Sequence, residues 1–195
     1  MPGLLLMDTD IISQMGKPRP PPGLRPWLQR VGTANLAICY PVIAELMRGA
    51  HLLQQTDPEK ADRISEWVAK VRATDFVVLD MTLEVAAVYA RLTSTPALKH
   101  LWIPNPQMKR SRLGHDLMVA AISVTYEVPI ITGNFTDFLK IDKVLSLPGV
   151  YQPMTGTWHI EPSFPVLLPE YRAEEADPTV GLLPVMAPIS SPTSR

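Results

Sequence analysis

The chain has 195 residues, 18 of them basic and 19 acidic, for a formal net charge of -1. This length suits one α/β domain with an appendage, and the balanced charge argues against binding nucleic acid through one broad basic face. No apolar run approaches the roughly 20 residues of a membrane helix, so we expect no membrane contact. The single cysteine, Cys39, excludes a disulfide framework within the chain and fits a reducing cytoplasm.

The first half of the sequence alternates predicted strands with predicted helices. Residues 4–7 are an apolar run that fits a central strand, and they lead directly into Asp8, Thr9 and Asp10. Prolines 41 and 58 suit the first turn of a helix, where a missing backbone N–H costs nothing. The expected order is a strand over 4–7, a proline-rich loop over 17–23, a helix over 24–31, a strand over 34–40, helices from 41 and from 58, a strand over 76–79 and a helix over 83–92.

Residues 114–138 are the most informative stretch of the sequence. The helix expected from residue 116 is too continuously apolar for a surface helix, so we predict that it is largely buried. Residues 128–132 are a short β-branched run of the kind found in buried parallel strands. Asp116 stands in the first turn of this helix, and Asp137 stands in a polar turn just past the strand.

Two further segments depart from this alternation. A loop over 93–112 carries a basic group that includes Lys109, Arg110 and Arg112. An edge strand is expected over 144–147, and from residue 155 onward the apolar periodicity is lost among many prolines. We therefore predict an α/β domain over 1–154 and a proline-rich extended or disordered tail over 155–195.

The alternation predicts a parallel sheet of four or five strands with helices on both faces. Ligands of such sheets bind at the carboxyl ends of the strands. Five acids stand near predicted strand ends or helix starts: Asp8, Asp10, Glu45, Asp116 and Asp137. Taken singly, each could be a helix cap, a turn residue or a solvated side chain.

Taken together, these acids predict a site for a divalent cation. Several carboxylates at one place repel one another, and a divalent cation removes that cost. Oxygen ligands without a histidine or cysteine cluster favour Mg²⁺ or Mn²⁺. Such ions activate water and neutralise a phosphodiester, which is the chemistry of a metal-dependent nuclease.

Four motifs match a known family in order and character: LLLMDTDIIS, PVIAELMRG, GHDLMVAAIS and TGNFTDF. Over roughly residues 3 to 148 the chain resembles the PIN-domain ribonucleases, and within them the VapC-like toxins of type II toxin–antitoxin systems. The resemblance implies that residues 1–154 are a PIN-like nuclease domain with a doubly wound sheet of strand order 3-2-1-4-5. It also implies Mg²⁺ or Mn²⁺ as cofactor, single-stranded RNA as substrate, a cognate antitoxin as partner and a homodimer.

By position in these motifs, the resemblance implies roles for individual residues. The catalytic set is Asp8, Glu45, Asp116 and Asp137, of which Asp8, Asp116 and Asp137 hold the metal, with Thr9 and Asn134 as polar supports. We expect Asp137 rather than Asn134 to supply the last charge, because a carboxylate balances a divalent cation and an amide does not.

Positive charge near this acidic set is scarce. Gly133 stands where the family often has a basic residue. We therefore predict that Lys109, Arg110 and Arg112 guide RNA toward the acids, with a merely solvated loop as the alternative.

Two other functions remain open from the sequence. Met7 to Asp10 resembles the start of haloacid-dehalogenase-type phosphatases, in which the first Asp, here Asp8, becomes phosphorylated. Those enzymes also need a lysine and a later acidic pair, which this chain does not offer in the right context. The non-enzyme alternative is a degenerate PIN fold that only binds protein or RNA.

Overall fold

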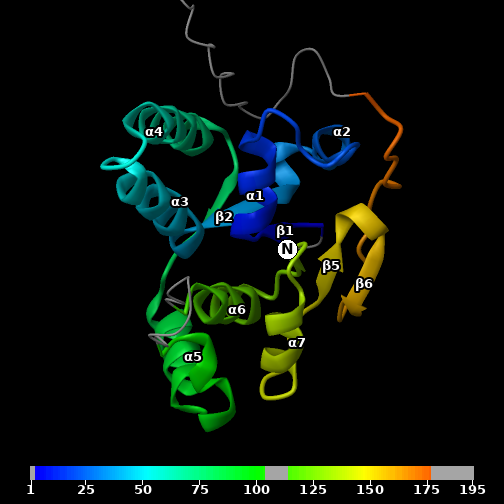
Figure 1. Ribbon diagram of the computed structural model, residues 1–195. Coiled ribbons are helices and arrows are strands. Elements are labelled where there is room, and N and C mark those ends of the chain that lie inside the picture. The colour runs from blue at the N-terminus through cyan, green and yellow to red at the C-terminus, as the bar shows by residue number, and fades with distance from the viewer. Residues whose placement is uncertain (1–2, 104–113, 177–195) are drawn as a thin grey trace, which may run out of the picture.

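The computed structural model describes residues 3–103 and 114–176, and six strands in this part of the chain form one sheet (Figure 1). Their order is β3-β2-β1-β4-β5-β6, in which β6 alone is antiparallel to its neighbour. The predicted fold class and the implied order 3-2-1-4-5 are thus confirmed, with a sixth strand added at one edge. The strands are β1 (Leu5–Met7), β2 (Leu36–Cys39), β3 (Val77–Leu79), β4 (Ile130–Ile131), β5 (Val150–Gln152) and β6 (Thr157–Ile160).

Helices cover both faces of this sheet. In Figure 1, α1 and α2 lie on one side of β1, and α6 and α7 lie on the other. The helices are α1 (Thr9–Gly16), α2 (Leu24–Val31), α3 (Tyr40–Leu53), α4 (Pro58–Ala73), α5 (Leu83–Ser94), α6 (His115–Tyr126) and α7 (Thr136–Asp142), with short 3-10 turns η1 (Thr33–Asn35), η2 (Pro96–Leu101) and η3 (Pro153–Thr155). None of the described helices is both long enough and apolar enough to cross a membrane.

The sequence explains where several of these helices begin. Asp57 accepts a hydrogen bond from the backbone N–H of Lys60 at 3.1 Å and thereby caps α4, with Pro58 in its first turn. Thr82 caps α5 in the same way through the N–H of Val85. Gly114 precedes α6 with a φ of 69°, in the left-handed region that favours glycine.

Strand β1 and helix α6 form the centre of the core. Leu5, Leu6 and Met7 of β1 are fully buried. Helix α6 also buries its middle residues, Leu117 and residues 119–123, so the prediction of a largely buried helix is confirmed. Two buried elements thus hold fixed the positions at which β1 ends and α6 begins.

Two predictions about the region after α7 were wrong. Residues 144–147 are a turn, because Asp142 Oδ1 accepts the N–H of Leu147 at 2.8 Å and draws the chain back. The edge strand comes later, as β5. The predicted tail from residue 155 in fact contributes β6, so the sheet has six strands where four or five were expected.

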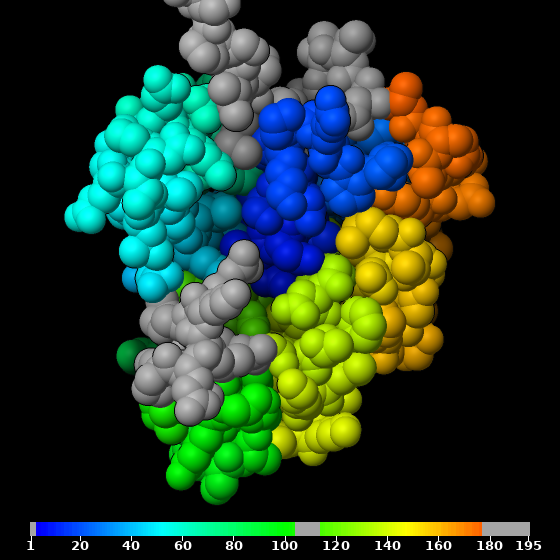
Figure 2. Space-filling model, in the orientation of Figure 1, coloured from blue at the N-terminus to red at the C-terminus, as the bar shows by residue number. Residues whose placement is uncertain are grey.

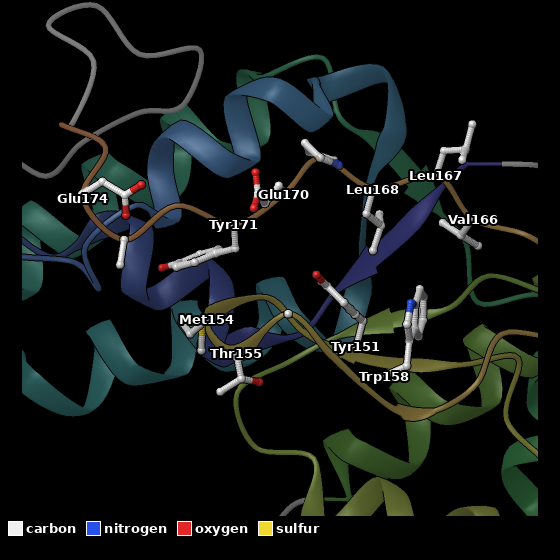
Figure 3. Close-up of a pocket in the computed structure, with 13 residues that line it drawn as sticks. Tyr151, Met154, Thr155, Trp158, Val166, Leu167, Leu168, Glu170, Tyr171 and Glu174 are labelled. Atoms are coloured by element: carbon white, nitrogen blue, oxygen red, sulfur yellow. The ribbon is translucent and has the colours of Figure 1, made fainter.

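Residues 161–176, which we call the arm, continue from β6 along the outside of the domain and contact α2. The indole Nε1 of Trp27 donates to the carbonyl of Pro169 at 2.8 Å, and Tyr171 Oη donates to the carbonyl of Pro22 at 2.6 Å. Arg30 forms an ion pair with Glu175. Between the arm and the β5–β6 hairpin lies a cavity of about 680 Å³, which Figure 3 shows lined by Tyr151, Trp158 and Tyr171 among others.

Candidate active site

The candidate site lies at the edge where β1 and β4 end. Met7 of β1 pairs with Ile131 of β4, so the residues that follow each strand lie side by side. Asp8 follows β1, and its backbone N–H donates to the carbonyl of Ile131 at 3.1 Å. Thr132 follows β4, and its Oγ1 donates to Asp8 Oδ2 at 2.8 Å. The start of the chain occupies the middle of the face in Figure 2, between the segments that carry the other acids.

Asp8 is the buried centre of this edge, with 6% of its surface exposed. Its Oδ1 accepts the N–H of Thr9 at 2.7 Å and caps α1, as its position after the strand suggested. Burial, and then the charges of Asp10 and Asp116, raise the pKa of Asp8 well above its ordinary 3.8. Two carboxylates are therefore close enough to repel that of Asp8.

Asp10 contacts the same edge from the first turn of α1. Its Oδ2 accepts the backbone N–H of Gly133 at 2.7 Å, and its Oδ1 accepts Thr132 Oγ1 at 3.2 Å. A Cβ on Gly133 would lie 2.7 Å from Asp10 Oδ2 and 3.0 Å from Met154 Cε. Glycine at this position therefore leaves room for the carboxylate. The sequence placed Asp10 among the strand-end acids, but the family motifs gave it no role.

Glu45 of α3 reaches the site through two partners. Thr9 Oγ1 donates to Glu45 Oε2 at 2.7 Å, and His115 Nδ1 lies 3.4 Å from the same oxygen. The hydrogen bond from His115 is the largest cause that lowers the pKa of Glu45 below its ordinary 4.5. Thr9 thus contacts Glu45, and so does His115, the residue before Asp116.

Asp116 stands in the first turn of α6, where a helix N-terminus favours a negative charge. Its charge is one of the causes that raise the pKa of Asp8, which places the two carboxylates near each other. Helix α6 is buried, so this position is held rigidly.

Asp137 lies in the first turn of α7, not in an irregular polar turn as the sequence suggested. It is 3% exposed, and its Oδ1 accepts Lys140 Nζ at 2.7 Å. Asn134 is exposed and shapes the preceding turn, since its N–H donates to Thr132 Oγ1 at 2.9 Å and its Oδ1 accepts Thr136 Oγ1 at 3.4 Å. Lys109, Arg110 and Arg112 lie outside the described residues, so their role in guiding RNA stays a prediction.

The donors of this edge suit a hard divalent cation. The carboxylates of Asp8, Asp10 and Asp116 offer oxygen alone, which Mg²⁺ and Mn²⁺ prefer and Zn²⁺ does not. Their mutual repulsion is a cost that a cation removes. Across residues 3–103 and 114–176 no three acidic, histidine or cysteine side chains already converge on one point, and carboxylates without a counter-ion are expected to stay apart.

Comparison with known proteins gives one related sequence and several related structures. No family model matches the chain. It is 32% identical over 110 residues to a protein named Ribonuclease VapC from Rickettsia bellii, an alignment that covers 55% of this chain and 72% of that relative.

The related structures are toxin–antitoxin complexes. They include FitAB bound to a DNA fragment (TM-score 0.58, 22% identity, 83% of this chain and 100% of that one) and FitAcB from Neisseria gonorrhoeae (TM-score 0.56, 23% identity, 71% and 94%). VapBC2 from Rickettsia felis, bound to a fragment of its promoter, has a TM-score of 0.53 at 18% identity and covers 80% of this chain and 98% of its own. At these identities the structures establish a shared fold.

Proposed function

This chain belongs to the VapC ribonuclease family, and from this premise we propose that it is a metal-dependent endoribonuclease that cleaves single-stranded RNA. One observation carries the proposal. Thr132 Oγ1 joins the carboxylates of Asp8, at 2.8 Å, and Asp10, at 3.2 Å, at the sheet edge where ligands of α/β folds bind, and the charges of Asp10 and Asp116 both act on the buried Asp8. An arrangement that raises the pKa of its own central acid is unfavourable by itself, and it is typical of a functional site.

Asp8 and Asp116, with Asp137 as the third ligand that the family motifs imply, would hold the Mg²⁺ or Mn²⁺ ion, and Asp10 is a further oxygen donor at the same edge. When bound, the ion would supply an activated water and neutralise phosphodiester charge. The chain's own residues orient these ligands. Thr132 fixes one oxygen of Asp8, and the N–H of Thr9 fixes the other. Such partners hold a ligand in one orientation.

Glu45 has a different environment from Asp8. It is more exposed, and hydrogen bonds from His115 and Thr9 help to keep its pKa low. It therefore remains ionised at neutral pH, and we propose that it accepts a proton from water at the rim of the site.

The assay for this function uses end-labelled single-stranded RNA with Mg²⁺ or Mn²⁺. The wild type should cleave it, and EDTA should stop the reaction. Asp8→Asn and Asp116→Asn should each abolish cleavage while the melting temperature does not fall below that of wild type. Asp62→Asn, which removes an exposed acid on α4, is the matched control and should cleave normally. Full activity in both site variants would refute the proposal.

We also propose that the protein is a toxin with an antitoxin partner and forms a homodimer. Helix α3, which carries Glu45, exposes apolar side chains next to the site: Tyr40 is 64% exposed and Leu52 is 61% exposed. They line a groove of about 470 Å³ together with Met47. Large exposed apolar side chains of this kind suit a protein partner, and co-expression with the antitoxin should suppress cleavage.

The same assay separates this function from the alternatives. A binding module would keep RNA affinity without cleavage in Mn²⁺. The family offers no support for the phosphatase interpretation of Met7 to Asp10, which requires a covalent phosphate on Asp8.

A further inference from the structure

A stacked pair of rings lies beside the acidic edge and has no part in the proposed chemistry. Phe135 and His159 lie with ring centroids 3.4 Å apart and planes 11° from parallel. Phe135 comes from the turn after β4, and His159 comes from β6. Both residues are half-buried, so part of the pair is open to solvent, whereas core aromatics such as Phe138 are closed off.

Polar groups fix this pair in place. His159 Nε2 lies 2.9 Å from Gln152 Oε1, and Thr155 Oγ1 donates to the same oxygen at 3.1 Å. Gln152 is only partly buried, and its amide nitrogen adds a donor at this position. Stacked rings together with an amide are the groups that proteins use to hold and read an unpaired base.

The chain places this pair next to the acids. Gly133 binds Asp10 through its backbone N–H, and Phe135 follows two residues later, a span of at most roughly 7 Å. The β5–β6 turn approaches from the other side, since Met154 packs against Gly133. A strand of RNA with one phosphodiester at the acids therefore passes the rings within a nucleotide or two.

We propose that Phe135 and His159, with Gln152, form a platform that binds one unpaired nucleobase of the RNA substrate beside the cleaved bond. This inference rests on the proposed ribonuclease function and adds a determinant of substrate choice. A base that stacks on the rings must leave any double helix, so the platform selects single-stranded segments. Gln152 and the ring edge of His159 then favour bases whose edges complement them.

The cavity below the arm is the competing location for a base. It is lined by Tyr151, Trp158 and Tyr171 (Figure 3). Because side chains alternate along a strand, Trp158 lies on the face of β6 opposite His159. However, Glu170 and Glu174 also line it, and their charges oppose an RNA backbone. The acids beside the Phe135–His159 pair are those whose charge the proposed cation would neutralise, so we assign the base to that platform.

The test uses a short RNA that the wild type cleaves at one mapped bond. In a matched series, each base near this bond is replaced in turn by an abasic ribose, and kcat/KM is measured for each oligonucleotide. Base–aromatic stacking predicts that one abasic position costs the wild type roughly 5- to 100-fold, mainly through KM.

Three variants connect that position to the platform. Phe135→Leu and His159→Ala should lose a similar factor on the intact RNA and become insensitive to the abasic change. Phe135→Trp should restore sensitivity, which a merely structural role for Phe135 would not predict. Trp158→Leu removes a neighbouring aromatic that faces the cavity, and it should behave as wild type. If Phe135→Leu does not fold, His159→Ala decides the test.

Other outcomes overturn the inference in distinguishable ways. If the wild type cleaves RNA but no abasic position lowers kcat/KM, the proposed function stands and the platform is refuted. Loss of sensitivity in Trp158→Leu, with Phe135→Leu unaffected, moves the base to the cavity. If the wild type cleaves no RNA with Mg²⁺ or Mn²⁺, both the ribonuclease function and the platform are refuted.

Discussion

Asp8 combines a structural role and a charged role in one side chain, and the two roles respond differently to substitution. As a cap of α1 it needs only an oxygen acceptor, which asparagine also provides. As a carboxylate it carries a charge that burial and its neighbours disfavour. Asp8→Asn should therefore keep the helix and remove the repulsion.

This difference predicts a change in the pH dependence of stability in EDTA. Because burial raises the folded pKa of Asp8 above 3.8, its contribution to stability is fully present below about that pH. The contribution is lost as pH rises through the folded pKa. In urea unfolding between pH 4 and pH 8, the free energy of unfolding of Asp8→Asn should therefore increase relative to that of the wild type as pH rises. A constant difference across that range would contradict the raised pKa.

Gly133 offers a second prediction at the scale of one residue. A methyl group at this position meets Asp10 Oδ2 and Met154 Cε, and crowding of this size costs about 1–3 kcal/mol. Asp10 can swing away, so we expect Gly133→Ala to lose cleavage activity while unfolding stability falls by no more than that amount. Gly49→Ala, where a Cβ meets nothing within 4 Å and φ is not in the left-handed region, is a control for a glycine-to-alanine change without crowding.

The sequence names candidate site residues, but it does not reveal their contacts. Asp8, Glu45 and Asp116 are candidates because each stands in a motif beside a strand end or helix start. The bond between Asp10 and Gly133 could not be predicted, because it joins residues 123 positions apart. Nor could the pairing of His115 with Glu45, since it depends on how α3 packs beside α6.

At the scale of elements, helix α7 decides how Asp137 is presented. The polar residues after β4 suggested a turn at this position, and Phe135, which precedes the helix, makes no side-chain cap that would mark its start. The helix holds Asp137 close to Lys140, whose charge must be displaced before the carboxylate can meet a cation.

The assignment of Asp137 to the metal is therefore open to a direct test. Asp137→Asn should weaken Mn²⁺ binding in calorimetry and cut the cleavage rate strongly. Asn134→Asp should keep much of the activity, because a cation accepts the added acid. If Asp137→Asn cleaves like wild type and Asn134→Ala is inactive, the two residues have exchanged roles.

The arm is the element that the sequence described least well. Its prolines interrupt the apolar periodicity that would predict a helix or strand. Its position is set by contacts with α2, which lies far away in the sequence. Deleting residues 161–195 removes the partners of Trp27 Nε1 and Arg30 and uncovers the ring of Trp27, which is fully buried.

We expect that deletion to lower the melting temperature. Two or three lost hydrogen bonds at about 1 kcal/mol each correspond to a decrease of roughly 4–10 °C for a domain of this size. A variant that ends at residue 176 keeps the arm contacts and is the matched control. Equal melting of the long and short deletions and the wild type would show that the arm adds nothing.

At the scale of the whole molecule, the cation should act as a stabilising ligand. A ligand that binds only the folded state adds about 2.7 kcal/mol at a concentration 100 times its Kd. The melting temperature of the wild type should therefore rise with Mn²⁺ concentration. Asp8→Asn and Asp116→Asn should show little of this rise, and Asp62→Asn should show all of it. An equal rise in every variant would place Mn²⁺ elsewhere.

The overall architecture was the part most fully predictable from sequence. Alternating strand and helix patterns have few solutions, and parallel strands joined by helices lead to a doubly wound sheet. The sixth strand escaped prediction because it is antiparallel, follows a short turn at Gly156 and lies in a proline-rich region.

The bond between Thr132 and Asp8 also has a consequence for the order in which the site appears during synthesis. It joins residues 124 positions apart, and at 5–20 residues per second the ribosome needs about 6 to 25 seconds to make that interval. Until then Asp8 lacks the strand β4 that packs beside it in the folded protein. A growing chain thus carries its acids separately, and the RNA that encodes it meets no assembled edge before residue 132 has been added.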